Sequence, residues 1–266
     1  MTLTHVRRAA RAPDDAPTLP SAAVPRARQR TALYLALTLG MAAVALAGFW
    51  PQYYGPLLSG AALAPRVGHW AVHVHAALFL GWLGLVAAQS QLVRAGRADL
   101  HRRLGPAMAR YGAAACVVGL WAGLALAARH TATGDAPDRG PILALLSVTD
   151  VLMFGGFLAA ACVYRRRPEA HKRLMVLATW SIALVGFGRL LTWAAPVVFA
   201  HRWWLAPPFF VLPVLVGVAH DWRTRRRVHP VWWVGLTLFA LRTYRPLLND
   251  WPPWVAAGRA LVRPFL

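Results

Sequence analysis

Long apolar runs separated by short arginine-rich loops recur along this 266-residue chain. Each run has roughly 18 residues or more, which is enough for one helix to cross the hydrocarbon layer of a bilayer, about 30 Å thick. We therefore predict an all-α integral membrane protein, a helical bundle of about seven transmembrane helices. The predicted spans are residues 31–50, 68–93, 105–128, 141–164, 174–197, 203–220 and 230–248.

Composition excludes a soluble domain of any size. The chain is 58% hydrophobic and 14% charged, with a mean hydropathy of +0.45, and one soluble core cannot bury that much apolar surface. A net charge of +20 also suggests nucleic acid. However, the arginines come in bursts between the apolar runs, as in cytoplasmic loops of membrane proteins. We therefore expect membrane lipid, and not nucleic acid, as the partner.

The two ends of the chain differ from the transmembrane domain, which we assign to residues 31–250. Residues 1–30 hold arginines among Ala, Pro and Asp with no apolar periodicity, so we predict a disordered basic cytoplasmic tail. The run 31–50 has the character of a signal-peptide core but is too long for one, and an uncleaved span is the better interpretation. Residues 251–266 are amphipathic and are predicted to lie in the membrane interface.

Basic residues also predict the orientation. The loops after the second, fourth and sixth spans are dense with arginine, whereas the alternate loops hold few. Because Lys and Arg are enriched in cytoplasmic loops, the amino terminus is expected in the cytoplasm of a multi-pass protein of the bacterial inner membrane. Seven spans would then place the carboxyl terminus outside.

One motif, R-x-[D/E]-x-H-[K/R]-R-L, occurs twice, at residues 97–104 and 167–174. Each copy follows one apolar run and opens another, and a weaker third copy surrounds His229. The apolar segments before the two copies also align, with His75 opposite Asp150. We interpret this as a parallel repeat of helical hairpins. The alternative is that any two basic loops between hydrophobic helices look alike.

The histidines of this motif are candidate ligands. A histidine in the first turn of a helix lies at the positive end of the helix dipole, which favours the neutral ring and leaves one nitrogen lone pair free. His101, His171 and His229 are each predicted at such a position. Two of them could hold a haem iron, or all three a metal ion; alternatively they are interfacial anchors. The arginines expected to bind haem propionates or lipid phosphates are Arg102, Arg103 and Arg173.

Further polar residues lie nearer the opposite membrane face. His73 and His75 occur in the second span and are also candidate cofactor ligands. Asp150 and Arg189 interrupt the fourth and fifth spans at similar depth, and ionisable groups at such depth need partners, so we predict that they pair. The pair would be either a proton or ligand site or a structural contact between helices.

Several segments carry a resemblance to known proteins. They are residues 49–54, 73–82, 91–96, 100–105 and 168–175. Over about residues 49–235 the chain resembles a group of bacterial polytopic membrane proteins of unknown function that have a His-Arg-Arg-Leu-Gly loop. The resemblance implies a helical inner-membrane protein and no particular mechanism. A looser similarity links it to b-type transmembrane cytochromes, in which histidines of neighbouring helices ligate haem, although here the inner histidines lie at helix entrances.

Two classes of function follow from these patterns. In the first, histidines at two depths bind haem b for membrane electron transfer, with quinone as the electron partner. In the second, the chain is a non-catalytic carrier, lipid-binding or assembly protein with no cofactor. The sequence does not decide whether the protein is an enzyme.

Overall fold

The computed structural model of the chain describes residues 23–64, 69–132, 138–196 and 207–266, and all regular structure in these residues is helical. The amino-terminal half contains α1 (Ala23–Phe49), the π-helical turn η1 (Trp50–Tyr54), α2 (Gly55–Ser59), α3 (Trp70–Arg94) and α4 (Ala98–Ala132). The remainder contains α5 (Arg139–Val163), η2 (Tyr164–Arg166), α6 (Pro168–Ala194), α8 (Pro207–Phe210), α9 (Leu212–Arg225), α10 (Pro230–Thr243), η4 (Arg245–Leu248), α11 (Pro252–Val262) and η5 (Arg263–Phe265).

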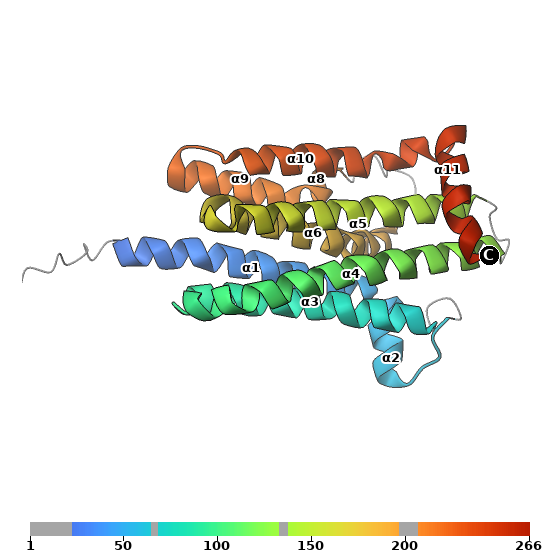
Figure 1. Cartoon of the computed structure of the whole chain (residues 1–266), viewed down its shortest axis with the longest axis horizontal. Coiled ribbons are helices and arrows are strands. Elements are labelled where there is room, and N and C mark those ends of the chain that lie inside the picture. The colour runs from blue at the N-terminus through green and yellow to red at the C-terminus, as the bar shows by residue number, and fades with distance from the viewer. Residues whose placement is uncertain (1–22, 65–68, 133–137, 197–206) are drawn as a thin grey trace, which may run out of the picture.

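Helices long and apolar enough to cross a membrane dominate the fold. The described residues contain five, which Figure 1 shows running side by side along the long axis. The all-α bundle is therefore confirmed, and the chain is a multi-pass membrane protein. The five spans are Ala32–Ser59, Trp70–Arg94, Ala98–Ala132, Arg139–Arg166 and Pro168–Ala194.

The predicted sixth and seventh spans are represented by shorter helices. α9 and α10 each have 14 residues, or about 21 Å at the helical rise of about 1.5 Å per residue, which is less than the thickness of the hydrocarbon layer. Residues 203–206 of the predicted sixth span lie outside the described residues. The structure thus confirms five spans by length, and a count of seven stays a prediction.

The helices begin earlier than the apolar runs. α1 starts at Ala23, eight residues before the predicted first span, and residues 1–22 of the predicted tail lie outside the described residues. α4 and α6 start at Ala98 and Pro168, so most of each repeated motif forms about the first two turns of a helix. The polar first turns were excluded from the predicted spans because hydropathy marks only the apolar part of a helix.

α6 is the most enclosed of the long helices. Leu177 and Leu184 are fully buried, and 56% of its most apolar stretch is buried inside the protein. α1 crosses it at very close range. A Cβ atom on Gly186 would lie 2.7 Å from Cα of Ala45, and one on Gly48 would overlap the carbonyl of Gly186. Small residues therefore bring the two backbones together, as at other membrane helix crossings.

Three hairpin connections lie at one end of the bundle, here called the hinge end. They join α3 to α4, α5 to α6 and α9 to α10 at residues 95–97, 164–167 and 226–229 (Figure 1). The carboxyl terminus lies at the opposite end, here called the far end, where α11 crosses the other helices. Val262 packs there against Leu124 and Ala144. The interfacial location of residues 251–266 stays a prediction.

Candidate functional site

His101 of α4 and His171 of α6 meet at the hinge end. Their ring centroids are 6.2 Å apart and the ring planes are inclined by 71°, so one edge faces the other ring. Both side chains are partly buried. The sequence predicted that two histidines of the repeated motif come together, and the structure brings these two into contact.

The two histidines occupy the same place in their helices. The backbone N–H of His101 donates to the carbonyl of Arg97 at 3.1 Å, and that of His171 donates to the carbonyl of Arg167 at 3.0 Å. Each histidine is the fourth residue of its helix. The shared motif therefore produces the same local geometry twice, and the pair is formed by two equivalent residues of the repeat.

The Nδ1 atoms of the two histidine rings have different environments. Nδ1 of His171 lies 2.8 Å from the carbonyl of Ala161 at the end of α5. Because a carbonyl only accepts, Nδ1 carries the proton, and in a neutral ring Nε2 then has a free lone pair. Nδ1 of His101 is buried and has no hydrogen-bond partner among the described residues. Arg102 and Arg103 follow His101 directly and are exposed.

His229 is not part of this pair, and it lies just before α10 and not in the first turn of a helix. It caps α10, and its Nδ1 accepts a hydrogen bond from the N–H of Val231 at 3.3 Å. Burial, followed by the charge of Arg173, lowers the pKa of His229, so the ring is neutral at pH 7. Within the described ranges no three His, Cys, Asp or Glu side chains could hold a metal ion together. The alternative in which all three histidines hold a metal ion is therefore not supported by these residues.

Arg173 is not available for a propionate or phosphate, contrary to prediction. Its side chain is 1% exposed and forms two hydrogen bonds to the fully buried carboxylate of Asp221 on α9, with Nε to Oδ2 at 2.9 Å. Its Nη1 also lies 2.7 Å from Glu169. The Asp221 carboxylate further accepts from the indole N–H of Trp232 at 3.0 Å. These contacts join α6, α9 and α10 in one ionic network.

The histidines of α3 have separate neighbours. Nδ1 of His73 is 2.8 Å from the hydroxyl of Tyr53. His75 stacks on Phe79 with centroids 4.4 Å apart, and its Nδ1 is buried with no hydrogen-bond partner in the described part of the chain. The two side chains therefore face different parts of the protein, although they are close in sequence.

The predicted pair of Asp150 and Arg189 is wrong. Asp150 instead binds two arginines from the end of the chain, with Nε of Arg242 2.9 Å from Oδ1 and Nη2 of Arg245 2.8 Å from Oδ1. Arg189 donates to Gln52 and lies 5.0 Å from the centroid of the Phe49 ring. Similar depth in the membrane was not sufficient to predict this ion pair, because the faces of α5 and α6 that carry the two residues point to different neighbours.

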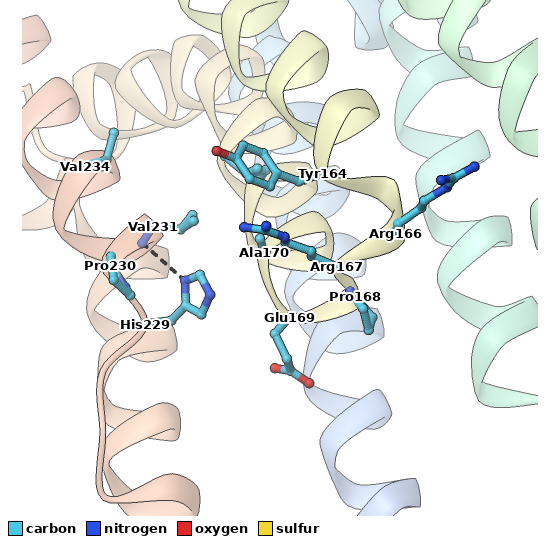
Figure 2. A pocket seen from close by; sticks show the side chains of 11 residues that line it. Tyr164, Arg166, Arg167, Pro168, Glu169, Ala170, His229, Pro230, Val231 and Val234 are labelled. Carbon is cyan, nitrogen blue, oxygen red and sulfur yellow. Dashed lines mark hydrogen bonds between the residues drawn. The ribbon is translucent and has the colours of Figure 1, made fainter.

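A groove of about 720 Å³ lies between the first turns of α6 and α10 (Figure 2). Figure 2 shows the guanidinium of Arg167 and the ring of His229 directed towards the space between these helices, whereas Arg166 points away. Leu174, Val231 and Val234 line the apolar part. The groove was not predicted, because it depends on α10 packing beside α6.

Comparisons with known proteins give no assignment: no protein-family model matches the chain, and searches of curated proteins and of solved structures found no significant match. The resemblance to bacterial polytopic membrane proteins and to b-type cytochromes therefore stays a prediction.

Proposed function

We propose that the protein is an electron-transfer protein of the bacterial inner membrane in which His101 and His171 hold the iron of a haem b. The observation that carries this proposal is the contact between the two equivalent histidines at 6.2 Å. A haem iron bound by this pair would be held through one ring nitrogen of each histidine, and the haem would supply one-electron chemistry.

The second ring nitrogens support the same proposal. Histidines that ligate metals usually donate their other N–H to a carbonyl or carboxylate, which fixes the ring and selects the free nitrogen. His171 has this arrangement with Ala161. His101 has a buried Nδ1 without a hydrogen-bond partner among the described residues, which a ligand would satisfy. The donor set therefore fits a bis-histidine haem.

The surrounding residues would orient the group and limit its exchange with water. Arg102 and Arg103 are exposed beside His101, where their guanidinium groups can bind carboxylate substituents. A bound haem b would supply one-electron transfer, and a membrane quinone is the electron partner that we propose. His73 is not included among the ligands, because it lies near the start of α3, at the opposite end of that helix from the connection that precedes His101.

The alternative is a non-catalytic carrier, lipid-binding or assembly protein without a cofactor. In that case the edge-to-face contact of His101 and His171 is itself the stabilising interaction, since such ring pairs are favourable in protein interiors. The colour of the purified protein distinguishes the two functions.

We predict that the protein, expressed with haem available, shows a b-type absorption band that shifts on reduction. His101→Ala and His171→Ala should each abolish the band, because each removes one of the two histidines that would hold the haem iron. Added imidazole should restore part of it in either variant. The measurement is the absorption spectrum of the detergent-purified full chain, oxidised and reduced, together with its iron content.

His229→Asn is the matched control for this test. Asparagine retains the capping of α10 but removes an imidazole at the same end of the bundle, so the band should remain. A colourless, iron-free preparation with both motif histidines intact would reject the haem proposal and favour the non-catalytic alternative.

We further propose that the hinge end faces the cytoplasm. Exposed arginines crowd its connections, including Arg97, Arg167 and Arg227, and cytoplasmic loops are enriched in such residues. A phosphatase fused to the carboxyl terminus, which lies at the far end, should therefore be active, and cysteines introduced at residues 96 and 166 should be protected from impermeant thiol reagents in intact cells. An inactive fusion together with labelled hinges would show the opposite orientation.

A further inference from the structure

The groove between α6 and α10 has a polar part and an apolar part within one concave surface. Arg167 and His229 provide the polar groups, and Leu174, Val231 and Val234 provide the apolar wall (Figure 2). Tyr164, which is exposed at the end of α5, also lines it. Amphipathic aromatic residues of this kind concentrate at the headgroup level of a membrane. The composition of the groove therefore matches an amphiphile with a polar head and an apolar chain.

The charge inside the groove is positive, although Glu169 lines it. Glu169 is neutralised by Lys172 at 2.9 Å, Arg173 at 2.7 Å and Arg225 at 2.5 Å. Arg167 lies over the ring of Tyr164, 5.6 Å from its centroid, and forms no ion pair within the part of the chain that the structure describes. A guanidinium without a carboxylate partner is the group best suited to bind a phosphate.

His229 adds a donor without adding a charge. Because Nδ1 accepts the hydrogen bond from Val231, the proton of the neutral ring is on Nε2. Figure 2 shows this ring turned towards the side of the groove formed by α6. Arg167 and His229 can thus donate hydrogen bonds to the oxygens of one phosphate from opposite walls of the groove.

We propose that this groove binds one anionic phospholipid, with its phosphate between Arg167 and His229 and its acyl chain along Leu174, Val231 and Val234. The basic amino-terminal segment of the chain is a poor occupant, since its arginines would meet Arg167. The apolar wall favours a lipid over free phosphate. This inference is independent of the proposed haem, because the groove contains neither His101 nor His171.

The test uses native mass spectrometry of the delipidated full chain in detergent, titrated with phosphatidylglycerol or with phosphatidylethanolamine of identical acyl chains. We expect one tightly retained phosphatidylglycerol, and roughly tenfold weaker binding in Arg167→Gln, because a charge-assisted hydrogen bond is lost. Arg97→Gln is the matched control: it removes the same charge from the equivalent motif position, which does not line this groove, and should bind like the unaltered chain.

Two further experiments distinguish a phospholipid from free phosphate as the bound anion. Val234→Trp, which fills the apolar wall, should weaken retention of the lipid, whereas Leu241→Trp, two turns further along α10, should not. Inorganic phosphate at millimolar concentration should leave the lipid bound. Displacement by phosphate, equal retention of the two lipids, or equal effects of Arg167→Gln and Arg97→Gln would each overturn the proposal.

Discussion

Replacing Arg173 with methionine should lower the free energy of unfolding by about 3–5 kcal/mol, because it leaves a buried carboxylate without its counter-charge. Asp221 is fully buried and receives both Nε and Nη2 of Arg173. Methionine can fill the space of the aliphatic stem but not replace the guanidinium. The measurement is denaturant or thermal unfolding of the detergent-solubilised protein.

The motif supplies a control for this substitution. Arg103 is the residue equivalent to Arg173 in the first copy and is exposed, so Arg103→Met should change stability by less than about 0.5 kcal/mol. In the double variant Arg173→Met with Asp221→Asn, the amide oxygen can still accept from Trp232 and no buried charge remains, so part of the loss should be recovered. An Arg173→Met protein as stable as the Arg103→Met protein would contradict the ionic network.

Leucine in place of Gly186 should separate α1 from α6 and destabilise the bundle by about 1–3 kcal/mol or more. The new side chain would meet backbone atoms of Ala45, and the backbone of a helix cannot turn aside as a flexible side chain can. Gly186→Ala should already be destabilising for the same reason. Thermal unfolding in detergent, with scattering to detect aggregation, measures both variants.

Gly156 of α5 and Gly84 of α3 are the matched controls for the helix crossing. A Cβ on either glycine would meet no atom within 4 Å. Alanine is favoured over glycine in a helix by about 0.8–1 kcal/mol, so Gly156→Ala and Gly84→Ala should be neutral or stabilising. Equal losses at all three glycines would contradict the close approach at Gly186 as the cause of its loss.

The sequence predicted the helical bundle because its strongest signals are local. Apolar runs show where a chain crosses a membrane, and the predicted span 68–93 differs from α3 by two residues at its start and one at its end. The repeated motif also placed His101 and His171 in equivalent first turns. Equivalent positions on adjacent hairpins lie at the same depth, but the contact of these two rings also depends on which faces of α4 and α6 meet.

The ionic contacts were not predictable in the same way. Hydropathy gives the depth of a residue in the membrane but not the direction in which its side chain points, and the partner depends on which helices become neighbours. Asp150 was therefore assigned to Arg189, although Arg242 and Arg245 interrupt the last predicted span on one helix face. The three-residue spacing of these two arginines was the sequence feature that could have indicated a shared carboxylate partner. Asp221 gave less indication, because it lies eight residues before His229, outside the motif.

The two arginines on one carboxylate also constrain how the protein is assembled. Arg242 and Arg245 are only 11% and 12% exposed, and an arginine at the centre of an isolated membrane helix costs about 2.5–3.5 kcal/mol. Their carboxylate partner, Asp150, is on α5, 92 residues before Arg242 in the chain. For the predicted seventh span to lie in the apolar interior, these arginines would need the carboxylate of α5 as their partner. Synthesis from the amino terminus supplies α5 before α10, so the final hairpin joins a bundle whose first five spans have already been made.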